Sequence, residues 1–408
     1  MSPAETLDRR AWGRLALSVY LPTTLSFAGI GAVTPLIALT AYDLGASTPE
    51  AALMVALLGM GSLVGALPAG LIAQRFGERH SLVGALVADA LAILLAALAP
   101  TTWVLGVAVF AMGLTSAVLM IARQSFMTEY VPYRFRARAL STLGGVLRIG
   151  SFLGPLAGAA VVSLFDLRAA YWFAIAAALA AAAVSWLLPD LPVHHTEPDA
   201  EPAGMASVLR AHARTFLTIG LGAAALMLVR ASRDALLPLW AASIGLDAAQ
   251  TSLIFAASSA VDLTLFYLGG SLMDRHGRRA VAVPSMIVMG ACFGLLPLTG
   301  TAVGLGVIAL GLGLGNGIGA GVVMTLGSDA SPAAGRHHFL AGWRLTTGLG
   351  SAAGPLLISV LAAVASLAAA ALSIGAIGVL GAAWLWYWAR PTTPTGSTGG
   401  DAEQLPDL

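Results

Sequence analysis

The 408-residue chain has few charged residues, no lysine and a single cysteine. Asp, Glu, Lys and Arg together make up 10% of it, against about 25% in a typical soluble domain. Hydrophobic residues make up 58%, and the mean hydropathy is +0.85. This composition excludes an ordinary soluble protein and indicates one that is embedded in a lipid bilayer.

The sequence lacks the residue patterns that several kinds of chemistry require. Cys292 lies inside an apolar run, so no disulfide can form within the chain and a small core residue is the expected role. All seven histidines lie in polar segments, and the chain has no GxxxxGKS/T nucleotide loop, no GxSxG elbow and no HExxH helix. We therefore expect no enzyme activity, no metal, no cofactor, no nucleic-acid partner and no direct use of ATP.

Twelve apolar runs are long enough to cross the ~30 Å hydrocarbon core of a bilayer as helices. The first follows Arg9, Arg10 and Arg14, but it is too long for the core of a signal peptide, so we expect it to remain as a helix. The runs lie near residues 15–41, 50–73, 81–99, 103–128, 139–163, 169–189, 215–243, 250–271, 280–298, 302–326, 340–364 and 367–389.

Arginines gather in alternate loops, and the intervening loops hold only Arg168. By the positive-inside rule, both termini are cytoplasmic and the number of spans is even. We therefore expect a multi-pass protein of the cell inner (plasma) membrane. We also expect it to act as a monomer. The arginine-rich loops contain Arg75, Arg79, Arg134, Arg136, Arg138, Arg210, Arg214, Arg275, Arg278, Arg279 and Arg336.

The chain divides into two halves of six helices. Residues 190–214 are rich in proline, acid and histidine and read as a cytoplasmic linker. We predict a cytoplasmic tail at 1–14, six-helix halves at 15–189 and 215–389, and a disordered cytoplasmic tail at 390–408.

An offset of 200 residues relates the two halves at four separate places without a gap. Such parallel repeats place a substrate site near mid-membrane, between the halves. The expected fold is an all-α membrane protein with twelve transmembrane helices in two six-helix repeats. The matched sets are Gly45 with Gly245; Gly70, Arg75 and Gly77 with Gly270, Arg275 and Gly277; Glu129, Pro132 and Arg136 with Asp329, Pro332 and Arg336; and Gly150, Gly154 and Pro155 with Gly350, Gly354 and Pro355.

Two motifs carry a resemblance to a known family. The segment GSLMDRHGRR (270–279) resembles the signature loop of the major facilitator superfamily. GSFLGP (150–155) resembles the fifth-helix motif of its antiporters, and GSAAGP (350–355) echoes it in the eleventh helix. The resemblance covers residues 15–389 and implies the major facilitator fold, alternating access and a place near the twelve-helix drug/proton antiporters.

The resemblance also implies roles for the motif residues. In that family the loop latches one conformation; the alternative is plain turn formation, for which a glycine at 277 suffices. In the first copy Gln74 replaces the acid, so a carboxylate latch cannot form there. The glycines of the second motif allow close helix packing, and its prolines bend their helices. The latch residues are Gly270, Asp274, Arg275, Gly277, Arg278, Arg279, Gly70, Arg75 and Gly77; the helix-kink residues are Gly150, Gly154, Pro155, Gly350, Gly354 and Pro355.

Charges that do not repeat are the candidates for function. An ionisable group at the bilayer centre costs at least ~2.5–3.5 kcal/mol, so it normally faces a cavity or a partner. Seven such residues have uncharged counterparts at the same offset in the other half: Asp89, Arg123, Arg148, Arg230, Arg233, Asp234 and Asp262.

The densest of these charges lie in the seventh and eighth spans. Arg230 and Asp234 are four residues apart on one helical face, and Asp262 lies at a similar depth on the next span. A carboxylate beside arginines can switch between ion-paired and protonated forms, so we predict that Asp262, Asp234, Arg230 and Arg233 couple proton movement to transport. A fixed salt bridge and direct contact with a charged substrate are the alternatives.

Five further residues are candidates for lining the substrate cavity: Arg123, Gln124, Arg148, Asn316 and Trp240. Pairing of the arginines with Asp89 or Glu129 is the structural alternative for the first half. Asn316 could instead join two helices, and Trp240 could serve as an interfacial anchor. The chain also departs from drug-antiporter relatives, which carry an arginine early in the fourth helix where Val109 stands here.

The leading interpretation is a secondary active transporter that exports small amphipathic or drug-like molecules by proton antiport. Uptake or exchange of a small metabolite, such as an organic anion, is the alternative within transport. A membrane-embedded enzyme and a non-transporting scaffold on the same fold are weaker hypotheses from other classes.

Overall fold

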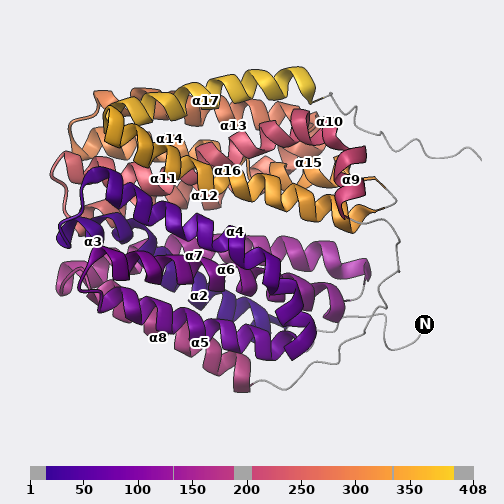
Figure 1. Cartoon of the computed structure of the whole chain (residues 1–408), viewed down its shortest axis with the longest axis horizontal. Helices are drawn as coiled ribbons and strands as arrows, with labels where there is room; N and C mark the ends of the chain where they lie inside the picture. The colour runs from indigo at the N-terminus through magenta and orange to yellow at the C-terminus, as the bar shows by residue number, and fades with distance from the viewer. Residues whose placement is uncertain (1–14, 132, 188–204, 333–334, 390–408) are drawn as a thin grey trace, which may run out of the picture.

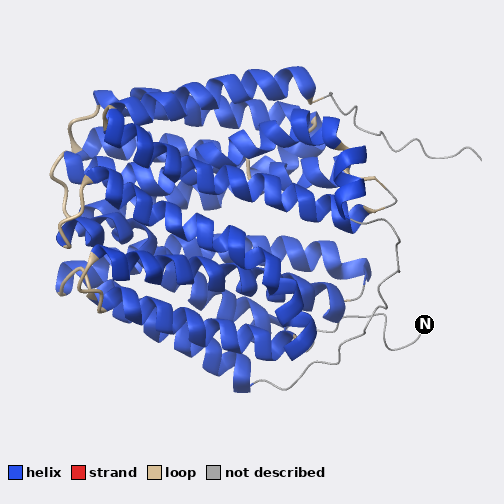
Figure 2. Ribbon diagram, viewed as in Figure 1, coloured by secondary structure: helices blue, strands red, loops and turns tan. Residues whose placement is uncertain are grey.

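The computed structural model describes residues 15–131, 133–187, 205–332 and 335–389. All regular secondary structure in these residues is helical (Figure 2). The predicted tails at 1–14 and 390–408 and most of the predicted linker lie outside the described residues, while residues 205–211 of the linker form a helix.

Twelve helices in the described residues are long and apolar enough to cross a membrane, as the sequence predicts. We call η2–α8 the N half and α10–α17 the C half. The N half contains η2 (Ala16–Tyr20), α2 (Leu21–Val33), η3 (Thr34–Leu36), α3 (Ile37–Asp43), α4 (Thr48–Phe76), α5 (Glu78–Ala97), α6 (Thr102–Tyr130), α7 (Tyr133–Leu164) and α8 (Ala169–Leu187). After α9 (Met205–Ala211), the C half contains α10 (Ala213–Thr215), η4 (Phe216–Gly220), α11 (Leu221–Ser243), α12 (Ala248–His276), α13 (Arg279–Leu295), η5 (Leu296–Leu298), α14 (Ala302–Ile318), α15 (Val322–Ala330), α16 (Arg336–Val364) and α17 (Leu367–Trp388).

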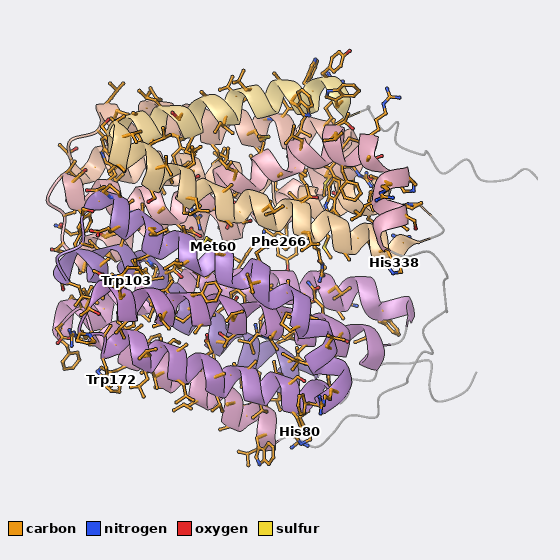
Figure 3. All side chains as sticks on the ribbon, in the orientation of Figure 1. Met60, His80, Trp103, Trp172, Phe266 and His338 are labelled. Atoms are coloured by element: carbon orange, nitrogen blue, oxygen red, sulfur yellow. The ribbon has the colours of Figure 1, made fainter. Side chains whose placement is uncertain are left out.

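The two halves lie one above the other in Figure 1, with their helices running in the same general direction. Short turns at 44–47, 98–101, 165–168, 244–247, 299–301 and 365–366 lie together at one end, which we call the Gly45 end. The glycine turns at Gly77 and Gly277 lie at the other, the Gly77 end. In Figure 3, Trp103 and Trp172 lie toward the Gly45 end, and His80 and His338 toward the Gly77 end.

Local structure repeats between the halves with the same offset as the sequence motifs. Ser47 and Glu50 form a capping box that starts α4, and Asp247 and Gln250 form one that starts α12. The offset also relates the π-helical turns η2 and η4. It relates positive-φ glycines at both ends as well, Gly45 and Gly245 at φ +83° and +80°, and Gly77 and Gly277 at +73° and +83°. The repeat therefore extends to the turn chemistry of the chain.

Three helix breaks do not repeat, and the apolar runs alone did not predict them. One is the 3-10 turn Leu296–Leu298, which ends the ninth span. The first span turns 3-10 helical at Thr34–Leu36, around Pro35, whose counterpart is Ala235. The tenth span breaks between α14 and α15, where Gly321 adopts φ +82° and its counterpart is Ile121. The expected continuous runs at 15–41 and 302–326 are thus each divided, because proline and glycine locally change the backbone.

The glycine–proline motifs pack helices inside each half. A Cβ atom added to Gly154 would lie 2.5 Å from the carbonyl oxygen of Ala28 on α2. One added to Gly354 would lie 2.5 Å from that of Leu228 on α11. These close approaches join α7 to α2 and α16 to α11, so the motif holds each half together. Pro155 and Pro355 lie within α7 and α16.

One apolar core cluster crosses between the halves, and it lies toward the Gly45 end. It contains Val33, Ile37 and Ala38 from the N half together with Leu236, Leu239 and Ile358 from the C half. Ser359 on α16 also donates a hydrogen bond to the carbonyl oxygen of Pro49 on α4, at 2.7 Å. Toward the Gly77 end, each half has separate apolar clusters of its own. The halves are therefore sealed together at the Gly45 end.

Candidate functional site

A cavity of about 900 Å³ lies between the two halves. Its lining comes from α2, α4 and α6 of the N half and from α11, α14 and α16 of the C half. Arg344, which lines it on α16, is exposed and stands near the start of that helix at the Gly77 end. Because the Gly45 end is sealed, the cavity opens toward the Gly77 end.

The two walls of this cavity differ in chemistry. The N-half wall carries no charge among its described residues and is built largely from Leu, Ile, Val, Met and Ala, with Ser62, Ser116 and Gln124 as its polar members. The four charged lining residues all belong to the C half: Arg230, Arg233, Asp234 and Arg344. The cavity therefore has an apolar wall that faces a charged wall.

A chain of polar contacts connects the C-half wall to the N half. Nε of Arg230 donates to Oδ1 of Asn316 at 2.6 Å, and Nδ2 of Asn316 donates to Oδ2 of Asp262 at 2.7 Å. Oδ1 of Asp262 lies 3.6 Å from Nε of Arg148, which is on α7 of the N half. Asp262 is thus the acceptor at a junction between the halves, although it is not itself among the residues that line the cavity.

Arg148 is held on both sides. Its guanidinium lies 4.1 Å from the ring centroid of Phe266, one turn beyond Asp262 on α12. Figure 3 labels Phe266 near the boundary between the two halves. Nη1 of Arg148 also donates to the carbonyl oxygen of Gly144 at 3.3 Å. The side chains of Arg148 and Asp262 are 19% and 12% exposed, so this ion pair is largely shielded from water.

The remaining pair predicted in the seventh span is local. Nε of Arg233 lies 3.5 Å from Oδ1 of Asp234, its neighbour in sequence, and its guanidinium lies 4.9 Å from the ring of Phe255. Asp234 therefore pairs with Arg233, while Arg230 reaches Asp262 through Asn316. The structure brings all four predicted coupling residues into one region, with Asn316 as a fifth member.

Arg344 joins the cavity residues, and our sequence selection omitted it. It donates to Oε1 of Gln124 on α6, a contact between the halves across the cavity. Two features of the sequence could have identified Arg344 as a candidate. It lies inside the eleventh span, and its counterpart 200 residues earlier is the uncharged Gly144.

Two of the sequence candidates lie elsewhere. Arg123 is only 2% exposed, and its guanidinium lies 5.4 Å from the ring of Phe27, inside the N half. It interacts electrostatically with Asp89, whose Oδ1 accepts a 2.6 Å hydrogen bond from Thr115. Trp240 donates its indole N–H to the carbonyl oxygen of Thr299 at the Gly45 end. Of the five predicted cavity residues, Gln124 and Asn316 line the cavity, whereas Arg123, Trp240 and the Asp262-paired Arg148 do not.

In the loop motif at 270–279, Arg278 forms an ion pair with Asp329 at the end of α15. Nε of Arg278 lies 2.7 Å from Oδ2 of Asp329. Asp274 and Arg275, the predicted latch pair, are exposed. Arg279 stacks on Trp386 with its guanidinium 3.4 Å from the ring centroid, and Arg79 stacks on Trp186 at 5.5 Å. These arginine–tryptophan contacts also repeat between the halves.

No group of three or more metal-ligating side chains occurs among the described residues.

Comparison with known families gives a match over most of the chain. The sequence profile of the Major Facilitator Superfamily matches residues 19–232 and again 219–406. Among curated proteins, Multidrug resistance protein MdtG of Citrobacter koseri is 25% identical over 177 residues, which are 42% of this chain and 44% of that protein. MdtG of Serratia proteamaculans is 28% identical over 177 residues, 42% of this chain and 43% of that protein. The aligned segment thus spans less than half the length of these relatives.

Solved structures share the fold at low sequence identity. A bacterial homologue of the human lysosomal transporter Spinster, in an inward-facing and unoccupied conformation, has a TM-score of 0.75 at 16% identity, covering 96% of this chain and all of that one. A D-xylose–proton symporter has a TM-score of 0.72 at 16% identity, covering 94% and 99%. At this identity the likeness shows the fold alone.

Proposed function

Because this chain belongs to the major facilitator superfamily and has the twelve-helix fold of its membrane transporters, we propose that it exports small amphipathic molecules across the inner membrane in exchange for protons. The Gly77 end would then face the cytoplasm, as the arginine-rich loops at 75–79 and 275–279 indicate. Transport would proceed by alternating access to the cavity between the halves.

The arrangement of contacts supports alternating access. Each half is held together by close helix packing at Gly154 or Gly354, whereas between the halves the shared apolar cluster lies toward one end. Rocking one half against the other would open this seal and close the Gly77 end, while the interior of each half stays packed.

The observation that carries proton coupling is the position of Asp262. Its carboxylate accepts from Asn316 at the cavity wall and pairs with Arg148 of the opposite half. Protonation neutralises the carboxylate and removes most of its attraction for Arg148, so the tie between the halves weakens. Occupancy of one proton site would thereby change the balance between the two conformations.

Export of amphipathic molecules is supported by two further observations. The matched relatives are named as multidrug resistance proteins, and GSFLGP resembles the antiporter motif. The cavity volume of about 900 Å³ lies within the ~300–1,000 Å³ range of sites for drug-sized ligands.

The test is transport in inverted membrane vesicles that hold the full-length protein, with fluorescent amphipathic molecules as substrates. We expect accumulation that requires an acidic vesicle interior and that collapses when an ionophore removes the proton gradient. Asp262→Asn should abolish this gradient dependence. The matched control is Asp166→Asn, an exposed aspartate in the turn at 165–168 of the Gly45 end, which should retain coupling.

Two outcomes would contradict the proposal. Gradient-dependent transport that survives in Asp262→Asn would remove this residue from coupling. Gradient-driven accumulation in right-side-out vesicles, with none in inverted ones, would favour uptake over export.

A further inference from the structure

We propose that the transported molecule is an amphipathic anion, which is attracted at Arg344, held at Arg230 and packed against the apolar N-half wall. This inference rests on the proposed function and specifies the substrate class of the same cavity.

The charges of the cavity do not balance. Three arginines and one aspartate line it, a surplus of two positive charges. Asp234 already pairs with Arg233 at 3.5 Å, and Asp262, behind the wall, pairs with Arg148 at 3.6 Å. Each nearby carboxylate therefore has its ion-pair contact with Arg148 or Arg233. Two arginines are left without such a contact: Arg344, and Arg230, which Asp262 and Asp234 attract only from a longer distance.

These two arginines are bound by neutral amides. Arg230 donates to Asn316, and Arg344 donates to Gln124. Among the residues that the structure describes, no carboxylate forms an ion pair with either guanidinium. An amide carbonyl supplies a dipole but no counter-charge, so both arginines can still accept an anionic partner.

A guanidinium binds carboxylate, phosphate or sulfonate groups through two parallel, charge-assisted hydrogen bonds. In a cavity with an apolar wall, such an ion pair is less screened than in bulk water. A cationic substrate would meet only Asp234, which is already paired. The surplus of charge therefore selects against cations and favours anions.

The opposite wall determines the rest of the molecule. Leu58, Met112 and Met120 face the cavity from α4 and α6, with no charged residue in the described N-half lining. Methionine side chains adapt to ligands of different shape because they are flexible and polarisable. An aromatic or aliphatic body fits this wall, whereas a highly hydroxylated one would lose hydrogen bonds to water there.

The two arginines stand at different depths, measured from the helix ends that lie at the Gly45 end. For Arg344 that end is Val364 of α16, and for Arg230 it is Ser243 of α11. At ~1.5 Å per residue, Arg344 lies about 30 Å from its helix end and Arg230 lies about 20 Å from its own. Arg344 is therefore nearer the open mouth and meets the anion first, and Arg230 binds it at mid-membrane, next to the Asn316–Asp262 contact.

The experiment compares three naphthalene ligands of one shape: 2-naphthoate, 2-naphthamide and 2-naphthylmethylammonium. Binding to the full-length protein in lipid nanodiscs is measured by calorimetry. We expect 2-naphthoate to bind roughly tenfold or more tightly than the other two, because only it forms charge-assisted hydrogen bonds with arginine.

Four variants and one control locate the site. Arg230→Gln and Arg344→Gln should each reduce the affinity for 2-naphthoate by about tenfold and leave that for 2-naphthamide unchanged. Arg230→Lys and Arg344→Lys should restore part of the loss, since they keep the charge. Arg168→Gln, at an exposed turn of the Gly45 end, is the control and should bind like the wild type. Thermal unfolding midpoints confirm that each variant is folded.

Equal affinity for the three ligands, no detectable binding of 2-naphthoate, or unchanged binding in both glutamine variants would overturn the inference. The proposed function fails separately. If 2-naphthoate binds at the two arginines but its movement ignores a pH gradient, the anion site stands and proton coupling does not. If the gradient drives the ammonium compound and not 2-naphthoate, coupling stands and the anion site does not.

Discussion

The N half and the C half share a scaffold and differ in where their charges lie. Capping boxes, π-helical turns, positive-φ glycines and close glycine contacts recur at matching positions of the two halves. In the N half, Asp89 and the fully buried Arg123 are enclosed within that half. In the C half, Arg230, Arg233, Asp234 and Arg344 line the cavity.

This difference separates residues that stabilise the fold from residues that take part in transport. A contact present in both halves serves a structure that both halves need, such as packing or a turn. A charge present in one half, and turned toward the cavity, has no counterpart role in the scaffold. The comparison therefore assigns stability to Asp89 and Arg123, and it assigns transport to the C-half charges together with Arg148, the N-half partner of Asp262. Each assignment can be tested.

The largest expected effect comes from Asp89→Asn. Arg123 would lose the carboxylate that acts on it, leaving a buried, uncompensated charge at a cost of about 3 kcal/mol of stability. The midpoint of thermal unfolding of the purified protein should fall, while the protein that remains folded should keep proton-coupled transport. Asp262→Asn should instead lose proton-coupled transport. A stable but uncoupled Asp89→Asn variant would end the division between the halves.

A smaller effect is expected from alanine at the repeated glycines. Gly154→Ala and Gly354→Ala each place a methyl group against the backbone of a neighbouring helix, at a cost of about 1–3 kcal/mol. The two losses, measured by thermal unfolding, should be similar. Gly306→Ala is the matched control, because its added Cβ meets no atom within 4 Å. A large loss in only one half would show that the scaffold is not equivalent in the two halves.

The smallest effect is expected at the repeated arginine–tryptophan contacts. Arg79→Gln and Arg279→Gln each remove a cation–π contact at the membrane edge, worth about 0.5–1 kcal/mol. Both variants should unfold slightly earlier and transport normally. Impaired transport in Arg279→Gln alone would instead support a latch role specific to the second loop motif.

Much of the fold follows from the sequence. Twelve apolar runs and the constant offset between the halves predict the helices and their order, because a bilayer requires long apolar helices and a duplication preserves their spacing. The divided first and tenth spans were missed. Hydropathy records the length of an apolar run, whereas Pro35 and Gly321 change the backbone without changing that length.

The site was predictable in part. The depths of Arg230 and Asp262 could be estimated by counting residues, and both contact Asn316 in the structure. The pairing of Asp262 with Arg148 could not be predicted, since it depends on how the halves dock and on the rotation of each helix about its axis. Arg344 could have been predicted from the sequence alone. Like the other candidate charges, it lies within a span and has an uncharged counterpart in the other half, Gly144.

The gap-free offset of 200 residues also provides matched pairs of labelling sites in the two halves. Each residue number in the N half names a twin in the C half, and at some sites both twins are exposed, as Asp43 and Ser243 are at the Gly45 end and Phe76 and His276 are at the Gly77 end. Spin labels on one twin pair after another would measure the two mouths of a single molecule independently. Rocking lengthens one twin separation as it shortens the other, whereas uniform swelling lengthens both.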